Sequence, residues 1–297
     1  MTDRSLDEIA ARIEGGVRLS DAEARQLMTS PDILAIGMLA DDARRRRHGD
    51  RTTFVRVADV PVESDDLEWP EAAGEIRLVG IPDTLELACE RITRVTDKAV
   101  ATPVSGFSLA DLQALARREG AALPLVLARL KEAGLELIAE AFLDDPGDLQ
   151  TALRSIQSAG LRLARCTSRG SGLAAVDLIR RAVTLQDATG AIRALAPLPR
   201  QVPGERPSTG YDDVRVVAVA RLMADNIESI QVDWTLYGPK LAQVALTFGA
   251  DDVDGVAADE GGALGLRRRT AAEIRRNIRA ANQTPVERNG RFEPVFS

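Results

Sequence analysis

The sequence predicts an α/β protein, a (β/α)8 barrel of the TIM type preceded by a helical extension. After residue 50, short apolar runs alternate with amphipathic helical patterns, and eight such runs can be counted. Alternation of strand and helix favours a parallel sheet, and eight strands favour closure into a barrel. The length of 297 residues suits either one barrel or two ordinary domains, so the prediction of a barrel depends on the periodicity and not on the length.

The first 50 residues are expected to form the helical extension, and residues 51–297 the barrel with a C-terminal helical tail. Ser20 followed by Glu23 resembles a capping box, which marks the start of a helix. The basic run 44–48 closes the last helix of this segment. There it either complements the helix dipole or forms a binding patch.

Within the barrel, each expected helix follows an expected strand except at the beginning. The expected strands are 52–60, 74–80, 99–104, 135–142, 161–168, 191–198, 229–236 and 252–258. The expected helices are Thr84–Asp97, Leu109–Ala133, Asp148–Ala159, Ala174–Thr189, Tyr211–Asn226 and Pro239–Phe248. Between the first two strands, PVESDDLEWPEAA is too short and broken for a crossover helix, so that helix is predicted to be missing. The barrel is then either open beside its first strand or covered there by the segment that contains Trp69.

Composition excludes several classes of protein. The formal charge of −7 argues against a nucleic-acid partner, because phosphate contacts require clustered Lys and Arg. No apolar stretch approaches the roughly 20 residues that span a bilayer, and the charged start does not resemble a signal peptide. We therefore expect a cytoplasmic protein. The two cysteines, Cys89 and Cys166, suggest no disulfide framework, and no metal-binding motif is present.

Long stretches of the chain resemble radical S-adenosylmethionine (SAM) aminofutalosine synthase of the futalosine route to menaquinone. They are the helix-rich start, VLARLKEAGLE (126–136), TPVER (284–288) and YDDVRVVAVARLMADNIESIQVDWTLYGPKLAQVALTFGADDVDGV (211–256). Cyclic dehypoxanthinyl futalosine synthase and the deazaflavin (FO) synthase subunits are similar in the same places. The resemblance implies a barrel of the radical SAM type with its active site over the carboxyl ends of the strands.

In that family, a CxxxCxxC loop after the first strand holds a four-iron, four-sulfur cluster, and the cluster binds SAM. This chain has no cysteine before residue 89, so we expect no iron–sulfur cluster, no other metal and no cofactor. Gly80 stands where the family has a Gly-Gly pair that receives SAM, but Ile81 replaces the second glycine, which puts SAM binding in doubt. The chain resembles a degenerate member of the family that has lost the cluster motif.

Without the cluster, acid–base chemistry would fall to carboxylates at the strand ends. The candidate catalytic residues are Glu140, Asp233 and Asp254, and the candidate substrate-binding residues are Arg165, Arg169, Thr167, Asp252 and Gly80. Two plainer interpretations stay open. DDVDG (251–255) would be a turn with capping acids, and the arginines would pair with Glu140 or a neighbouring acid instead of a ligand.

The leading hypothesis is a cluster-less homologue of aminofutalosine synthase, associated with menaquinone biosynthesis, that acts as a non-radical binding or partner protein. Its partner would be an active radical SAM paralogue, a second copy of the chain or a small molecule. The alternative is a non-radical lyase or hydrolase that uses the carboxylates on a chorismate-derived or nucleoside-like substrate. It predicts a polar pocket containing Glu140, Arg165 and Asp233. A scaffold without a ligand is the third hypothesis. The GSG at 170–172 and the Pro-rich loop 201–209 are weaker candidates for an anion site and a lid.

Overall fold

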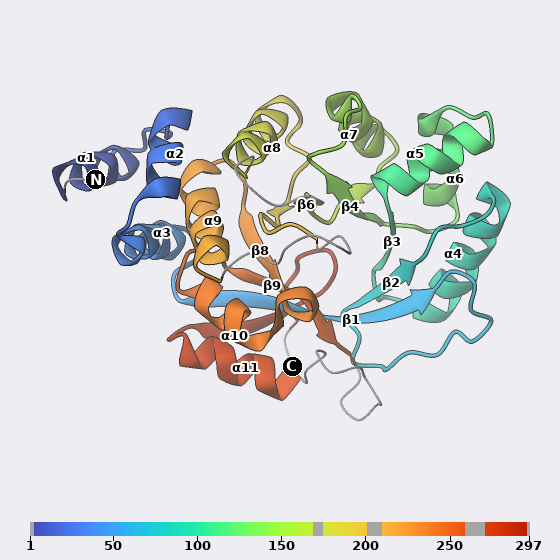
Figure 1. Ribbon diagram of the computed structural model, residues 1–297. Helices are drawn as coiled ribbons and strands as arrows, with labels where there is room; N and C mark the ends of the chain where they lie inside the picture. The colour runs from blue at the N-terminus through green and yellow to red at the C-terminus, as the bar shows by residue number, and fades with distance from the viewer. Residues whose placement is uncertain (1–2, 169–174, 201–209, 259–270, 296–297) are drawn as a thin grey trace.

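A ring of parallel strands surrounded by helices forms the centre of the molecule, as seen in a computed structural model (Figure 1). The structure describes residues 3–168, 175–200, 210–258 and 271–295. The strands are β1 Arg51–Pro61, β2 Glu75–Val79, β3 Val104–Ser108, β4 Leu137–Phe142, β5 Arg162–Leu163, β6 Cys166–Thr167, β7 Ala194–Leu195, β8 Ser229–Asp233, β9 Asp252–Ala257 and β10 Thr284–Arg288.

The ring closes where β1 pairs with both β2 and β9. The strand order is β1-β2-β3-β4-β6-β7-β8-β9, and the short β5 pairs with the first half of β4 while β6 pairs with its end. Because β5 and β6 are two pieces of one strand position, the described residues form a closed barrel of eight strand positions, as predicted. β10 lies outside the ring and runs parallel to the first half of β1.

The predicted helices are present, with some shifts of their bounds. The helices are α1 Asp3–Glu14, α2 Asp21–Thr29, α3 Ile33–His48, α4 Leu85–Ala99, α5 Leu109–Arg118, α6 Leu123–Glu132, α7 Leu149–Ser158, α8 Ala175–Thr189, α9 Gly210–Met223, α10 Trp234–Leu246 and α11 Ala271–Ala280. The single helix expected over 109–133 is wrong: it is two helices, separated at Gly120, whose φ is 62°. The third strand starts at Val104 and not at residue 99, because α4 continues to Ala99. The C-terminal tail contains the strand β10 as well as a helix.

The predicted absence of the first crossover helix is confirmed: residues 62–74 contain turns but no helix. This segment, which we call the strap, nevertheless leaves the barrel closed. Trp69 packs on a small cluster of Ala58, Ala73 and Ala258, and the ammonium of Lys98 lies 5.1 Å from the centre of its ring. The strap is therefore a cover that α4 holds against the end of β1.

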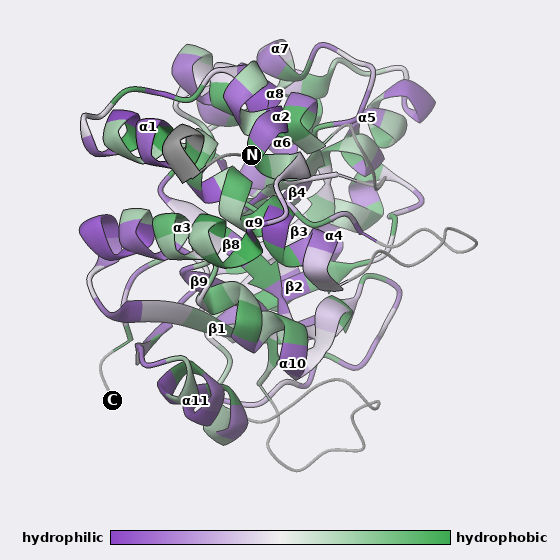
Figure 2. Cartoon of the chain, turned by 60° about the vertical axis from the view of Figure 1, so that its left-hand side comes forward, coloured by the Kyte–Doolittle hydropathy of each residue, from purple (hydrophilic) through white to green (hydrophobic). Residues whose placement is uncertain are grey.

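The N-terminal helices pack on the barrel helices on one side of the molecule (Figure 2), with α3 against α9 and α2 against α8 and α9. The basic run at the end of α3 makes specific contacts there. Arg47 donates to the carbonyls of Ile227 and Asp225, and His48 Nε2 lies 3.1 Å from the carbonyl of Glu228. The run thus helps to fasten the extension to the loop before β8.

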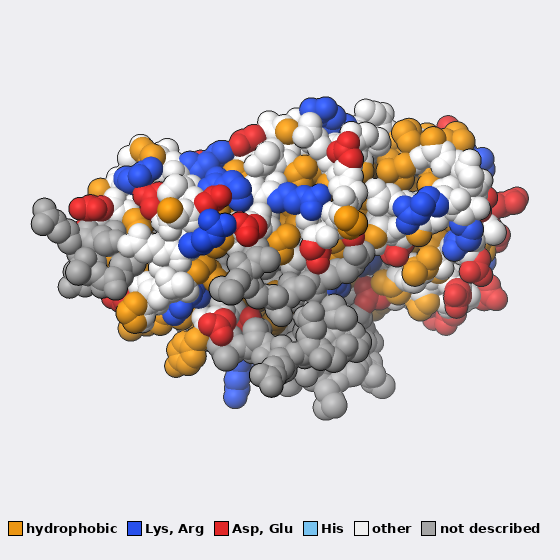
Figure 3. All heavy atoms as spheres, turned by 45° about the horizontal axis from the view of Figure 1, so that its top comes forward, with side chains coloured by type: hydrophobic (Ala, Val, Ile, Leu, Met, Phe, Trp, Pro, Cys, Tyr) orange, Lys and Arg blue, Asp and Glu red, His pale blue; other side chains and the backbone are white. Residues whose placement is uncertain are grey.

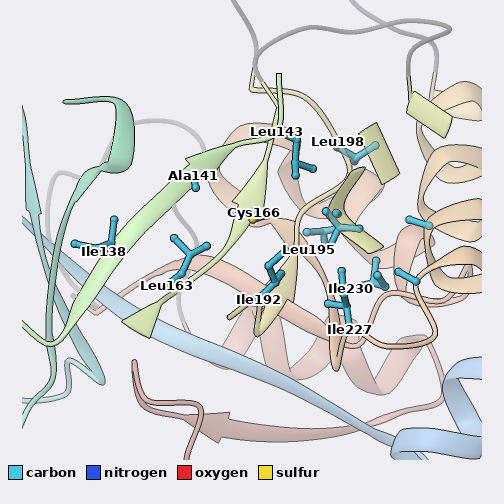
Figure 4. Packing of buried hydrophobic residues seen from close by; sticks show 14 of the residues in the cluster. Ile138, Ala141, Leu143, Leu163, Cys166, Ile192, Leu195, Leu198, Ile227 and Ile230 are labelled. Carbon is cyan, nitrogen blue, oxygen red and sulfur yellow. The ribbon is translucent and has the colours of Figure 1, made fainter. Parts of the chain in front are cut away.

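Apolar side chains fill the layer between strands and helices, and Figure 4 shows the part around β4 to β8. On the described part of the face in Figure 3, basic and acidic side chains are interspersed. Among the described residues, no helix combines the length and the apolar character needed to cross a membrane.

Candidate functional site at the carboxyl ends of the strands

A cavity of about 270 Å³ opens at the carboxyl ends of the barrel strands. The residues that line it come from β1, β2, β3, β4, β8 and β9 and from the segments that follow strands, and they are Val57, Asp59, Arg77, Leu78, Val79, Gly80, Phe107, Ser108, Asp111, Ala139, Glu140, Arg165, Arg200, Asp233, Thr235, Leu236 and Gly255. Active sites of TIM barrels lie at this end. Four acids and three arginines line the cavity, so its chemistry is that of charged groups.

Glu140 stands between two arginines on the cavity wall. Its Oε2 lies 2.8 Å from Nη1 of Arg200 and 3.5 Å from Nη2 of Arg165. The Glu140 side chain is 14% exposed and that of Arg200 31%, whereas Arg165 is 4% exposed. Burial and the neighbouring Arg165 lower the pKa of Arg200 from its ordinary value. The accessible part of this trio is therefore the Arg200 guanidinium, with Glu140 beside it.

A buried ion network forms the floor of the cavity. Arg77 donates to Asp254 over 3.0 and 3.1 Å and to Glu75 over 2.8 and 2.9 Å, and Arg165 donates to the same Asp254. Burial alone would oppose ionisation of Asp254, but Arg77 and Arg165 outweigh it and hold its pKa well below the usual range. Asp254 is thus a permanently charged anchor that positions two arginines.

Asp233 ends β8 and caps the helix that follows. Its Oδ1 accepts hydrogen bonds from the backbone N–H groups of Thr235 at 2.8 Å and Leu236 at 3.0 Å. Burial and the nearby charge of Asp254 raise the pKa of Asp233. At Gly255, where φ is 73°, an added Cβ would approach Thr235 Oγ1 to 2.7 Å and Asp233 Oδ1 to 3.0 Å. Glycine at this position allows β9 to lie against the cap.

The backbone of the cavity wall is strained at the end of β3. Phe107 adopts a φ of 60°, which is rare for a residue with a bulky side chain, and it is 3% exposed. Conformations of this kind persist where the surrounding structure enforces them, and they gather at functional sites. Phe107 and Gly80, whose φ is 104°, shape the apolar side of the cavity.

Four of the predicted site residues line the cavity, and a fifth lies beneath it. Glu140, Asp233, Arg165 and Gly80 line the cavity together. Asp254 lies beneath it, and both of its oxygens accept hydrogen bonds from arginines. The geometry therefore places Asp254 away from direct acid–base work. Arg165 pairs with Glu140 and with Asp254, as the plainer interpretation of this arginine predicted.

Two predicted ligand contacts do not reach the cavity. Asp252 is at the opposite end of β9, fully buried, and both its oxygens bind Arg288 at 2.6 Å. Thr167 is also buried, with its hydroxyl 3.5 Å from the carbonyl of Leu198. The turn suggested for DDVDG is wrong, because Asp252 and Asp254 both lie in β9. Arg169, GSG (170–172) and the loop 201–209 lie outside the described residues.

Arg77 and Arg200 also line the cavity but were not predicted as site residues. Arg77 carried a signal: Glu75 and Arg77 alternate with apolar residues in a strand that was expected to be buried, so both side chains point to the same face. Charges at alternate positions of a barrel strand indicate a polar barrel interior. Arg200 lies after β7 in irregular backbone, where no periodicity marks a side chain.

The thiols of this chain do not fit an iron–sulfur cluster, which needs three or four thiolates. The chain has two cysteines in all. Cys166 lies among Leu163, Leu195 and Ala141 in the apolar layer (Figure 4), and burial raises its pKa to about 12. Cys89 is on α4, and burial raises its pKa as well. The strap, which follows β1, contains no cysteine. Among the described residues, no group of three or more His, Cys, Asp and Glu side chains is arranged to hold a metal ion.

Comparison with known proteins agrees with the fold and with the resemblance seen in the sequence. Residues 197–296 match the family described as CofH/MqnC C-terminal region. The chain is 25% identical to the aminodeoxyfutalosine synthase of Thermus thermophilus over 99% of this chain and 96% of that protein. It is 30% identical to the cyclic dehypoxanthine futalosine synthase of Streptomyces coelicolor over 40% of this chain and 32% of that protein.

Solved structures show the same barrel. Methylornithine synthase (PylB) has a TM-score of 0.66 at 13% identity, covering 93% of this chain and 97% of that one. The hydrogenase maturase HydG of Carboxydothermus hydrogenoformans has a TM-score of 0.66 at 15% identity, covering 95% of this chain and 79% of that one. At these identities the structures show the fold alone. The sequence matches indicate that this chain is a member of the radical SAM family.

Proposed function

We propose that this chain is a cluster-less member of its family that binds a small molecule at the barrel mouth without radical chemistry. The observation that carries the proposal is the cavity at the carboxyl ends of the strands, where Arg200, Glu140 and Asp233 converge. The resemblance implies an active site at this position, and the charged lining here supports retention of a ligand. The two cysteines and the thiol-free strap support the loss of the cluster.

The lining favours a ligand that carries both an anionic and a donor group. Among the described residues, the side chain of Arg200 has one polar partner, Glu140, although a guanidinium has five N–H donors. Arg200 can therefore also take a ligand carboxylate, which guanidinium binds in a bidentate manner. Glu140 and Asp233 provide acceptors for hydroxyl or ammonium groups nearby. Because two relatives are synthases of the futalosine route to menaquinone, an intermediate of that route is the first ligand class to test.

A second function, a non-radical lyase or hydrolase, rests on Asp233. Burial and the charge of Asp254 raise its pKa above the ordinary value, which is the direction that a carboxyl acting as a general acid or base requires. Glu140 and Arg200 would then orient a chorismate-derived or nucleoside-like substrate beside it. Turnover that follows a pH profile and is abolished by Asp233→Asn would favour this function over simple binding.

The direct test of cluster loss is anaerobic reconstitution of the purified chain with iron and sulfide, followed by removal of unbound metal. We expect no stable four-iron, four-sulfur signal in the electron paramagnetic resonance spectrum after reduction, and no 5′-deoxyadenosine when SAM and a reductant are added. A stoichiometric cluster together with reductive cleavage of SAM would overturn the proposal. Aminodeoxyfutalosine synthase, treated in parallel, is the positive control.

If the protein acts through a partner, that partner would be an active radical SAM paralogue or a second copy of the chain. Co-purification with the paralogue, or a doubled mass in solution, would support this part of the proposal. A monomer that binds a small molecule by itself, with binding lost in Arg200→Ala, would place the function at the barrel mouth.

A further inference from the structure

A second cavity lies at the amino ends of the strands, on the side of the barrel opposite the mouth. Its volume is about 500 Å³. Its lining residues come from the beginnings of β4 and β5, from α7 and α8, from the segments that precede β7 and β8 and from the segment after β10, and they are Leu137, Ile156, Gln157, Leu161, Arg162, Leu163, Gln186, Gly190, Ala191, Ile192, Arg193, Asn226, Glu228, Arg291 and Phe292. We propose that this lower cavity binds a phosphorylated polyol or sugar, independently of the site at the mouth.

Two arginines in the lower cavity have no acid partner. Arg162 and Arg193 are both exposed, and among the described residues neither lies within 4 Å of a carboxylate oxygen. Arg291, on the same wall, is already neutralised by Glu136 over 2.6 and 2.7 Å. The buried arginines that line the mouth are all ion-paired. Unpaired positive charge therefore distinguishes the lower cavity from the mouth.

The positions of Arg162 and Arg193 are fixed by the sheet. Leu163 and Ile192 bridge the two neighbouring strands, so the residues that flank them lie at adjacent strand ends. Arg193 also lies over the ring of Phe292, with 5.3 Å from its Cζ to the ring centre, and Arg288 stacks on the same ring at 3.8 Å. Phe292 adopts a φ of 65°, a costly conformation that presents its ring to these cations.

The charge and the amides of the lower cavity define the ligand class. A phosphate monoester carries about −1.5 to −2 charges at pH 7, which matches two guanidiniums. Gln157 donates through its Nε2 to the carbonyl of Thr189, which leaves its oxygen as an acceptor, and the exposed carboxylate of Glu228 is a further acceptor. Acceptors beside a cationic pair suit the hydroxyl groups of a phosphorylated polyol better than a plain anion.

The test is calorimetric titration at fixed ionic strength with two probes, ribose 5-phosphate and inorganic phosphate. We expect the double change Arg162→Ala with Arg193→Ala to weaken binding of ribose 5-phosphate at least about tenfold, because each lost charge-assisted hydrogen bond is worth that much. Arg154→Ala, which removes an exposed arginine of α7 outside the cavity, should change affinity less than about twofold. Urea unfolding of each variant checks that it is folded.

Glu228→Gln separates a built site from general attraction to positive charge. It should strengthen binding of inorganic phosphate, because a repelling carboxylate is removed, and weaken binding of ribose 5-phosphate relative to phosphate, because an acceptor becomes weaker. Equal affinity of the double variant and the wild type would overturn the proposal. Loss of binding in Arg200→Ala would also overturn it, because the ligand would then lie at the mouth. The same holds if the wild type binds both probes no more tightly than the double variant does.

Discussion

Asp254 shows how the role of one side chain depends on its neighbours. A carboxylate near the end of a barrel strand is a reasonable candidate for catalysis, and its sequence position carries no information on whether arginines surround it. Here Arg77 and Arg165 occupy both of its oxygens. Among the described residues, the groups that donate to Oδ1 of Asp233, on the neighbouring strand, are backbone N–H groups, and its pKa is raised. The two acids therefore differ in the chemistry they can perform.

Asp254→Asn should lower the free energy of unfolding by about 3–5 kcal/mol, because two buried guanidiniums lose their counter-charge. Asp177→Asn is the matched control: its pair with Arg25 is 62% and 55% exposed, and the change should cost less than about 1 kcal/mol. Urea unfolding at pH 7 measures both. Similar costs for the two variants would show that the network does not stabilise the barrel.

The pH dependence of the free energy of unfolding should also reveal the stabilising charge of Asp254. Since the folded state lowers the pKa of Asp254, its contribution is present above the unfolded value of about 3.9 and is lost as pH falls below it. Unfolding midpoints between pH 5 and 2 should therefore fall more steeply for the wild type than for Asp254→Asn. Parallel curves would contradict the assignment.

Helix α10 gives a test at the scale of an element. Asp233→Asn keeps an N-cap oxygen and removes a charge that burial disfavours, so the free energy of unfolding at pH 7 should stay within about 0.5 kcal/mol of the wild type or rise. Asp233→Ala removes the cap and should cost about 1 kcal/mol. Because folding raises the pKa of Asp233, the pH dependence of its contribution to stability is opposite to that of Asp254. The contribution comes from the protonated carboxyl: it is present at low pH and is lost as pH rises through the folded pKa. A destabilisation by Asn equal to that by Ala would exclude this role.

The strap is the second element that can be tested. Trp69→Ala should lower the free energy of unfolding by about 2 kcal/mol, because the indole covers Ala58, Ala73 and Ala258 and meets Lys98. Glu68→Ala, at an exposed neighbouring position, should cost less than about 0.5 kcal/mol. Circular dichroism during urea unfolding compares the two. An unchanged midpoint for Trp69→Ala would mean that the strap does not seal the barrel.

The sequence predicts regular elements well and side-chain environments less well. Apolar periodicity and glycine positions gave the eight strand positions, most helices and the missing first crossover, since these depend on local pattern. The split at Gly120 and the strand β10 were missed. Glu140 and Asp233 lie toward the carboxyl ends of β4 and β8, as predicted, and Arg165 lies between β5 and β6, the two pieces of the predicted fifth strand. Asp252 was predicted to contact a substrate, but it begins β9, at the end of the barrel opposite the mouth.

At the scale of the whole molecule, the barrel has one cavity at the carboxyl ends of its strands and another at the amino ends. The network around Arg77 and Asp254 is the floor of the mouth, and Arg288 binds Asp252 below it while stacking on Phe292. The mouth combines acids with paired arginines, whereas the lower cavity has unpaired ones.

The central claim is that the barrel mouth binds a small molecule without a cluster, and calorimetric titration of the iron-free protein tests it most directly. The titrants are SAM, a futalosine-type nucleoside and a chorismate-derived enol ether, with Arg200→Ala in parallel and Arg154→Ala as the control. The account predicts one-to-one binding of at least one titrant, weakened at least about tenfold by Arg200→Ala and unchanged by Arg154→Ala. Absence of binding to the iron-free protein, with binding restored only after a cluster is reconstituted, would contradict it.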